Sequence, residues 1–336
     1  MSFSLGREGR TFFDFPTMRV LLSTCSFQDT PGPHHALLEA QGWDVVCERG
    51  PLSEARMLEI AGEFDAFLCG DDGITRAVLE KSLPRLKIIS KYGIGLDKID
   101  IPATKELGIP VLFTPGVNHD TVAEHTFALL LAITKNLIFA VDSTRAGRWD
   151  RKTGNELFEK RIGLIGFGRI GQEVAKRAVA FGMKVHGFGN YWPDELAAQL
   201  GIVRHDTLDS LFASVDIISP HTKLTADTHH CVNAARLALM PKGGWVINTG
   251  RGELVDNAAI IESLDAGHLA GYATDVLDQE PPPADHPLLH HPKVIVTPHV
   301  GSRTFESVPR QAQKSLVNLI NALAGHGEIH CANGVI

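Results

Sequence analysis

The sequence predicts an α/β protein with two parallel β-sheets. Short apolar runs of β-favouring residues alternate with stretches of helical periodicity, and strands that alternate with helices form βαβ units. This alternation begins near residue 18 and starts again near residue 161, after a polar, turn-prone link over 147–159. A chain of 336 residues is also long enough for two domains of ordinary size.

The composition excludes several functional classes. Apolar residues make up 44% and charged residues 21%, so a core can form. A net charge of −7 argues against nucleic acid or an anionic membrane surface as the partner, and no apolar run is long enough to span a membrane. The five cysteines are scattered, which is typical of reduced thiols in a cytoplasmic protein rather than of disulfides. The adjacent histidine pairs lack metal-ligand spacing, so no metal is expected.

The elements of the first half follow from these patterns. Residues 1–17 carry charges and lack the apolar segment of a signal peptide, so we expect a flexible arm. Helices are expected over 34–41 and 52–61. A long helix over 120–138, capped by Asn118, is apolar nearly all round and should be buried on every side. The expected strands cover 18–22, 43–47, 66–69, 87–89 and 110–113.

The second half repeats the alternation, and its last predicted helix covers 304–324, where apolar residues recur at helical spacing. The expected strands cover 161–165, 183–188, 215–219, 244–248, 270–275 and 293–297. The expected helices between them cover 170–181, 193–200, 207–213, 231–239 and 255–266.

A glycine-rich turn follows the strand over 161–165. Gly166, Gly168 and Gly171 form the pattern G-x-G-x-x-G and lead into a helix. The first glycine allows the tight turn, the second lets the backbone approach a pyrophosphate, and the third permits close packing of helix on strand. The N–H groups at the start of the helix favour an anion. The sequence therefore predicts a dinucleotide site that includes Arg169 and Ile170.

One part of the dinucleotide pattern is missing. An acidic residue normally binds the adenosine ribose at the end of the next strand, but Gly189 stands there. No carboxylate repels a 2′-phosphate and no adjacent arginine attracts one, so the choice between NAD and NADP stays open. Asn190 could bond a ribose hydroxyl, which favours NAD. Lys223, after another strand, could instead partly compensate and permit NADPH.

Three further segments carry unusual polar residues directly after predicted strands. They cover 248–252, 275–281 and 297–302. Open α/β sheets bind ligands at the carboxyl ends of their strands. We therefore expect these segments to contribute to one site.

These segments resemble the D-isomer-specific 2-hydroxyacid dehydrogenases, and the resemblance covers the chain from about residue 18 to the last helix. It is carried in order by the loop Lys91-Tyr92-Gly93-Ile94-Gly95-Leu96-Asp97, by Pro115–Asn118 with Val122–Glu124, by the glycine turn, by Asn248–Asp256, by Asp275–Pro281 and by Pro298–Gly301. So many ordered matches are far more specific than the glycine turn alone.

The resemblance implies an NAD(P)-dependent dehydrogenase of a small 2-hydroxy acid, which works as a 2-keto acid reductase in the other direction. His299 would be the acid/base, because imidazole titrates near neutral pH, and Glu280 its carboxylate partner. Arg251 would hold the substrate carboxylate with its planar fork. The loop Tyr92, Gly93, Ile94 and Gly95 would be a second carboxylate anchor, formed by backbone N–H groups. The cofactor residues implied are Gly166, Gly168, Arg169, Ile170, Gly171, Asn190, Thr121, His221, Thr225, Thr249, Gly250, Asp275 and Gly301, with Asp275 on the nicotinamide carboxamide.

The family layout also implies the domain organisation. A Rossmann dinucleotide-binding domain over 114–303 would be inserted in a flavodoxin-like substrate-binding domain made of 18–113 and 304–336, and the protein would be a homodimer. D-3-phosphoglycerate dehydrogenase is an alternative, although the loop 69–75 offers two aspartates where those enzymes tend to be basic. Formate and phosphite dehydrogenases have similar site residues. An NAD(H)-binding corepressor-like module is the alternative of another class.

Overall fold

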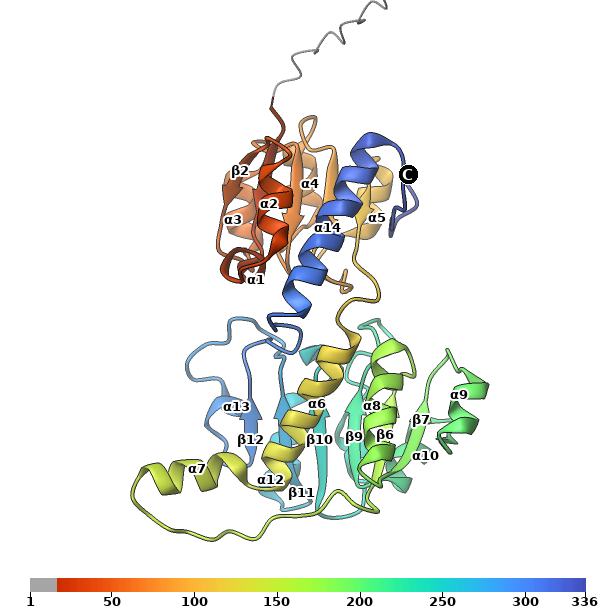
Figure 1. The fold of residues 1–336 in the computed structure, drawn as a ribbon. Coiled ribbons are helices and arrows are strands. Elements are labelled where there is room, and N and C mark those ends of the chain that lie inside the picture. The colour runs from red at the N-terminus through yellow and green to blue at the C-terminus, as the bar shows by residue number, and fades with distance from the viewer. Residues whose placement is uncertain (1–16) are drawn as a thin grey trace, which may run out of the picture. The chain divides into compact units, whose positions relative to one another are not determined.

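A computed structural model describes residues 17–336, so the expected arm lies outside the described residues except for Thr17. The chain forms two compact units (Figure 1). Unit 1 contains the described residues up to Thr114 together with Ala312–Ile336, and unit 2 is Pro115–Gln311. Unit 2 is therefore inserted in unit 1. The chain passes between the units at 114/115 and 311/312, whereas the sequence placed these points at 113/114 and 303/304.

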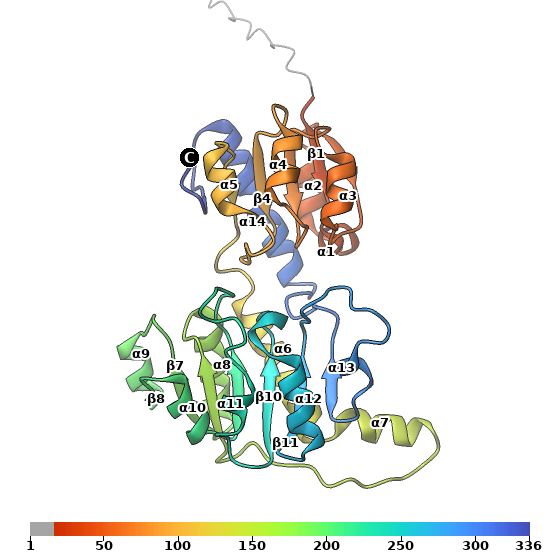
Figure 2. The ribbon, with the colours of Figure 1, turned by 180° about the vertical axis from the view of Figure 1, so that it is seen from behind.

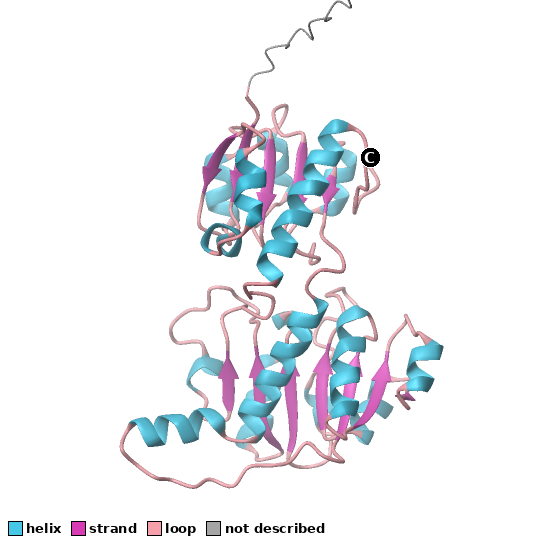
Figure 3. Cartoon of the chain, in the orientation of Figure 1, coloured by secondary structure: helices cyan, strands magenta, loops and turns pink. Residues whose placement is uncertain are grey.

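Unit 1 contains a five-stranded sheet in which every neighbouring pair is parallel (Figure 3). The strand order is β2-β1-β3-β4-β5, the flavodoxin-like order. Its strands are β1 (Arg19–Leu22), β2 (Asp44–Cys47), β3 (Ala66–Cys69), β4 (Ile88–Lys91) and β5 (Val111–Leu112). Its helices are α1 (Cys25–Asp29), α2 (Pro33–Glu39), α3 (Glu54–Ile60), α4 (Arg76–Ser82), α5 (Ile101–Glu106) and most of α14 (Ser307–Ala324).

Both faces of this sheet are buried. Leu21 and Phe67 share one core cluster with Met57 of α3, while Val20 and Leu68 share the other with Leu316 of α14. Successive strand residues point to opposite faces, so a strand with helices on both sides is apolar throughout. The continuous apolar runs in the sequence have this cause.

Unit 2 contains seven parallel strands in the order β12-β11-β10-β9-β6-β7-β8 (Figure 2). The chain starts at β6 and extends the sheet first to β8 and then, from β9, in the opposite direction. The carboxyl ends of β6 and β9 therefore mark the reversal where such sheets bind ligands. The strands are β6 (Arg161–Ile165), β7 (Lys184–Phe188), β8 (Val203–Arg204), β9 (Ile217–Pro220), β10 (Gly244–Asn248), β11 (Leu269–Thr274) and β12 (Val294–Val296).

Helices cover both faces of the second sheet. Phe127 of α6 and Val174 of α8 belong to one core cluster, and Leu211 of α10 and Ile260 of α12 belong to the other. The prediction of two parallel α/β sheets is thus confirmed. The helices of unit 2 are α6 (His119–Thr134), α7 (Leu137–Arg145), α8 (Arg169–Ala180), α9 (Asp194–Gln199), α10 (Leu208–Ser214), α11 (Ala234–Leu237), α12 (Asn257–Asp265) and α13 (Pro287–His290), with a 3₁₀ turn η1 over Gly252–Leu254.

The long helix predicted over 120–138 is wrong in three respects. It ends at Thr134, because Asn136 adopts a left-handed conformation (φ 53°) and α7 leaves at a bend of 63°. Asn118 is at the N-cap but its side chain makes no capping hydrogen bond. Glu124 and Ala128 are exposed, so one side of α6 is not covered.

No single helix in the described part of the chain is long and apolar enough to cross a membrane. The bent pair α6 and α7 passes the same test of length and composition when taken together, although most of α6 belongs to the core of unit 2.

Candidate active site

The carboxyl ends of the unit 2 strands carry most of the predicted site residues. Because the strands are parallel, their ends lie along one edge in sheet order. From β12 to β7 the segments along this edge are 297–301, 275–280, 249–251, 221–225, 166–171 and 189–190. The fold thus collects on one edge residues that are more than a hundred positions apart in the sequence.

The glycine turn after β6 requires its first and third glycines for different reasons. Gly166 has φ +99°, and a Cβ there would lie 2.7 Å from the carbonyl oxygen of His221. A Cβ on Gly171 would overlap the carbonyl oxygen of Gly166. Both glycines therefore let β6, α8 and the segment after β9 pack closely.

Gly168 provides the space that a dinucleotide needs. A Cβ on it would meet no atom within 4 Å, so its backbone faces open space. Gly168 is the N-cap of α8, a helix of 12 residues whose first N–H groups have no partner within the helix. An open backbone at a helix N-terminus fits a pyrophosphate. This arrangement fits the dinucleotide predicted from the sequence.

His299 and Glu280 form a direct pair at the other end of the edge. His299 Nδ1 lies 2.7 Å from Glu280 Oε2, and Glu280 Oε1 accepts a hydrogen bond from the Leu277 N–H at 2.9 Å. Both side chains are about one-third exposed, so a small molecule can reach them. His299 also has φ +52°, a conformation that is uncommon for a residue with a side chain.

Asp275, at the end of β11, holds the loop that carries His299. Its backbone oxygen accepts the His299 N–H at 2.8 Å, Oδ1 accepts the Val300 N–H at 2.9 Å, and Oδ2 accepts the Gly301 N–H at 2.7 Å. Burial acts to raise the pKa of the Asp275 carboxyl, but hydrogen bonds from His125 and Thr297 outweigh it and hold the pKa below its usual value. The carboxylate is therefore ionised and bonded on both oxygens.

Arg251 follows β10 and lies next to the Asp275–Glu280 segment. A Cβ on Gly252 would overlap the backbone of Leu277, so this glycine allows the two loops to touch. Asn248 Nδ2 donates to the Arg251 carbonyl at 2.8 Å, and Arg251 Nη1 donates to the Gly250 carbonyl at 3.0 Å. The backbone around Arg251 is thus fixed from both sides. Asn248 and Gly252 lie in a segment that the sequence assigns to the site, and the structure gives them a supporting role.

The remaining cofactor residues differ in their surroundings. Thr121 is buried on α6, Asn190 is exposed after β7, and Thr225 Oγ1 lies 3.1 Å from Thr228 Oγ1.

His221 Nε2 lies 2.9 Å from Ser219 Oγ, and burial lowers the pKa of its imidazole to about 4. Thr249 Oγ1 lies 2.9 Å from Thr126 Oγ1 of α6. Arg169 and Ile170 open α8 beside the turn.

The loop Tyr92–Gly95 belongs to unit 1 and follows β4. Gly93 has φ +126°, and its N–H donates to Thr114 Oγ1 at 2.8 Å. The Tyr92 N–H donates to the Cys69 carbonyl at 2.9 Å, so the N–H groups of Ile94 and Gly95 are the better candidates for an anion in this loop.

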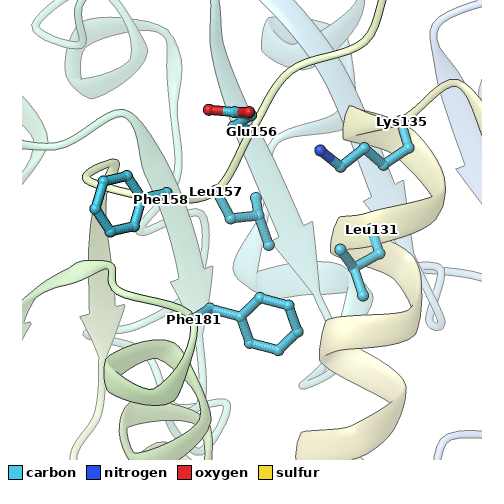
Figure 4. A pocket seen from close by; sticks show the side chains of 6 residues that line it. All are labelled: Leu131, Lys135, Glu156, Leu157, Phe158 and Phe181. Carbon is cyan, nitrogen blue, oxygen red and sulfur yellow. The ribbon is translucent and has the colours of Figure 1, made fainter.

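A pocket of about 370 Å³ lies elsewhere in unit 2 (Figure 4). Its walls come from the carboxyl-terminal ends of α6 and α8 and from the link before β6. Its lining residues are Leu131, Lys135, Glu156, Leu157, Phe158 and Phe181, and none of them is a predicted site residue. Among residues 17–336, no group of three or more histidine, cysteine or acidic side chains could hold a metal ion.

Comparison with known proteins gives the class of this site. Residues 127–301 match the model of the D-isomer specific 2-hydroxyacid dehydrogenase NAD binding domain. A glyoxylate reductase of Thermofilum pendens is 40% identical over 294 residues, which cover 84% of this chain and 86% of that protein. A D-lactate dehydrogenase of Aquifex aeolicus, solved with NAD and lactic acid, superposes with a TM-score of 0.80 at 29% identity and covers 91% of this chain and 96% of that one.

A D-3-phosphoglycerate dehydrogenase of Methanocaldococcus jannaschii is 42% identical over 236 residues, or 70% of this chain. The matched segment is 45% of that protein, so the chain spans about half the length of the phosphoglycerate dehydrogenase.

The chain belongs to the D-isomer specific 2-hydroxyacid dehydrogenase family. It is an NAD-dependent oxidoreductase that acts on the CH–OH group of 2-hydroxy acids, as the sequence predicted.

Proposed function

We propose that His299 is the acid/base of this reaction and that Glu280 is its partner. The observation that carries the proposal is the 2.7 Å contact between His299 Nδ1 and Glu280 Oε2. An ionised carboxylate only accepts hydrogen bonds, so Nδ1 carries a hydrogen and the proton exchanged with the substrate oxygen belongs to Nε2. When Nε2 also carries a proton, that proton is the one that His299 would donate to the oxygen of a keto acid.

The other residues bind and orient. NAD supplies or accepts a hydride at C2 of the substrate when it is bound. Arg251 holds the substrate carboxylate, since its planar fork matches two carboxylate oxygens. The N–H groups of Ile94 and Gly95 provide the second anchor implied by the resemblance, together with Tyr92 and Gly93 of the same loop. Gly168 and the N-terminus of α8 would hold the pyrophosphate, Gly166 and Gly171 would permit the turn that places them, and Asp275 would orient the nicotinamide.

We propose a small 2-keto acid without a phosphate group as the substrate. Lys91 is buried, and its Nζ lies 2.7 Å from Asp71 Oδ1 and donates to the Gly70 carbonyl. Asp72 is buried as well and accepts the Leu52 N–H at 2.6 Å. The lysine charge in this segment of unit 1 is therefore neutralised by a neighbouring carboxylate, which weakens any attraction for a phosphate.

One panel of assays tests which 2-keto acid is the substrate. NADH and NADPH oxidation is measured with glyoxylate, hydroxypyruvate, pyruvate, longer 2-keto acids and 3-phosphohydroxypyruvate. We expect the highest kcat/KM with glyoxylate or hydroxypyruvate. A preference for 3-phosphohydroxypyruvate would support the phosphoglycerate dehydrogenase alternative, which the similarity to the Methanocaldococcus enzyme favours. Tight NADH binding without turnover of any keto acid would support the corepressor-like module.

We also propose that the protein is a cytoplasmic homodimer. Leu137, Ile138 and Phe139 of α7 are 40–50% exposed, and Trp149 in the following link is 75% exposed. Figures 1 and 2 show α7 extending away from the unit 2 sheet. A second copy that covers these side chains would remove them from water. All five cysteines are free, which suits a reducing compartment.

Ile138→Asp is expected to shift the mass in sedimentation from dimer to monomer. Val203→Asp is the control, because Val203 is equally exposed on β8. An unchanged mass in Ile138→Asp would exclude α7 from the interface.

A further inference from the structure

His299, in the loop after β12, has an unfavourable backbone conformation, so contacts from outside the loop must hold it in place. The N–H groups of His299, Val300 and Gly301, three consecutive residues, all donate to Asp275. The two oxygens of the Asp275 side chain thus fix the backbone directly after His299. Any movement of this carboxylate would move the His299 ring relative to Glu280.

A second side chain, from α6, fixes the carboxylate itself. His125 Nε2 lies 3.2 Å from Asp275 Oδ1 and 3.0 Å from Thr297 Oγ1. Thr297 Oγ1 lies 2.6 Å from the same Oδ1. His125 therefore contacts both residues that hold the His299 loop: Asp275 at the end of β11 and Thr297, two residues before His299.

The chemistry of His125, Asp275 and Thr297 determines which of them donates in each of their three contacts. Asp275 is ionised and can only accept, so Thr297 uses its single hydroxyl hydrogen for Oδ1. The hydroxyl oxygen of Thr297 is then an acceptor toward His125, so His125 Nε2 must carry a hydrogen, which is shared between Thr297 Oγ1 and Asp275 Oδ1. Gly301 completes the packing, because a Cβ there would lie 2.8 Å from Asp275 Oδ2 and 3.4 Å from the His125 ring.

We propose that His125 is a positioning residue, whose Nε2–H holds Asp275 and Thr297 in place and thereby orients His299 against Glu280. The proposal rests on the proposed role of His299, but it concerns the geometry of His299, which can be measured without turnover. A sequence argument misses His125 because it stands within a helix with an apolar pattern and matches no motif.

A matched pair of variants tests the proposal in the full-length protein. His125→Gln keeps an N–H donor at the end of an unbranched chain, and His125→Met has nearly the same shape without a donor. His291→Leu is the control, since His291 forms a similar pair with Asp265 (3.3 Å) before β12, at the opposite end of that strand. For each protein kcat, KM, the Kd of NADH and Tm are measured. In parallel, ¹⁵N-histidine spectra report the His299 ring, whose signals are identified by their loss in His299→Gln.

We expect His125→Met to lower kcat by about 10- to 100-fold, the usual effect of a displaced catalytic group, with the Kd of NADH unchanged. The His299 Nδ1 and Nε2 signals should shift in this variant. His125→Gln should recover most of kcat and the wild-type His299 signals, and His291→Leu should change neither.

Three results would overturn the proposal. These are wild-type kcat in His125→Met, equal losses in the Met and Gln variants, and unshifted His299 signals in His125→Met. If instead His299→Gln retains turnover, the acid/base role fails, whereas shifted His299 signals in His125→Met would still establish the positioning.

Discussion

Nδ1 of His299 and Oε2 of Glu280 lie 2.7 Å apart, although the two residues come from loops after different strands, β12 and β11. Glu280 is fixed in turn by the Leu277 N–H at 2.9 Å. This pair sets the tautomer of the imidazole, so the proposed acid/base role of His299 belongs to Nε2.

His299→Gln is expected to lower kcat by about 10³-fold, because a positioned acid/base contributes roughly 10²–10⁴-fold. Glu280→Gln should lose about 10²-fold, since the ring remains but its charged partner is gone. Steady-state rates with glyoxylate measure both effects, and the Kd of NADH should stay within twofold of wild type. Near-normal turnover in His299→Gln would remove the residue from the mechanism.

Arg251→Lys should lower kcat/KM for the keto acid by about 10- to 100-fold, because an ammonium cannot make the two parallel bonds of a guanidinium. The Kd of NADH should be unchanged. Rates over a range of glyoxylate concentrations provide the measurement. An equal loss of NADH affinity would show that Arg251 supports the cofactor rather than the substrate.

Two single-methyl substitutions separate the cofactor role of the glycine turn from its structural role. A Cβ at Gly168 meets no protein atom, so Gly168→Ala should keep the wild-type Tm but weaken NADH binding at least tenfold. A Cβ at Gly171 overlaps the Gly166 carbonyl, so Gly171→Ala should lower Tm even without cofactor. Calorimetry and NADH fluorescence titration measure the two effects. Normal NADH affinity in Gly168→Ala would place the dinucleotide elsewhere.

The absence of a carboxylate at Gly189 leaves NADPH open beside NAD, and the hypothesis that Lys223 compensates for it predicts that the protein binds NADPH as well as NADH. A Cβ at Gly189 would lie 3.2 Å from the Phe167 nitrogen and 3.5 Å from the Gly166 Cα, beside the glycine turn. Gly189→Asp should therefore weaken NADPH binding about tenfold or more through charge repulsion and spare NADH. Lys223→Ala should weaken NADPH alone. Fluorescence titration gives both Kd values, with Gly189→Asn as the uncharged control. An unchanged NADPH/NADH ratio in Gly189→Asp would refute this account.

His221 should make unit 2 sensitive to acid. Burial lowers its pKa to about 4, whereas in the unfolded chain it lies near 6.5, so protons bind the unfolded state more strongly. The corresponding stability is present above pH 6.5 and is lost as the pH falls toward 4. The drop in Tm between pH 7 and pH 5 should therefore be smaller in His221→Gln than in wild type. His326→Gln, an exposed site, should behave like wild type. Equal drops in all three proteins would contradict the assignment.

The sequence predicted all described strands except β8, because most of them are apolar runs that stand out from their surroundings. It missed β8, since Val203 and Arg204 are both exposed and form no apolar run. It misplaced the end of α6, since Leu137 and Ile138 continue the apolar pattern and only the backbone of Asn136 shows the break. Within the site, the glycine turn could be predicted from its local motif, and the pair His299–Glu280 from the resemblance to the family. The support formed by His125, Asp275 and Thr297 could not, because it joins a helix and two strand ends that only the tertiary fold brings together.

The insertion of unit 2 has a consequence for synthesis on the ribosome. Residues that follow unit 2 in the chain complete the sheet of unit 1: Asn333 Nδ2 donates to the Ile109 carbonyl at 2.7 Å, and Cys331 pairs with Leu112 across more than 200 positions. Unit 2 is continuous in the chain and has its own two core clusters, so it can fold while translation continues. Unit 2 can therefore be folded while the ribosome still adds the residues that follow it, whereas β5, already beside β4, lacks the contacts of Cys331 and Asn333 until they are made.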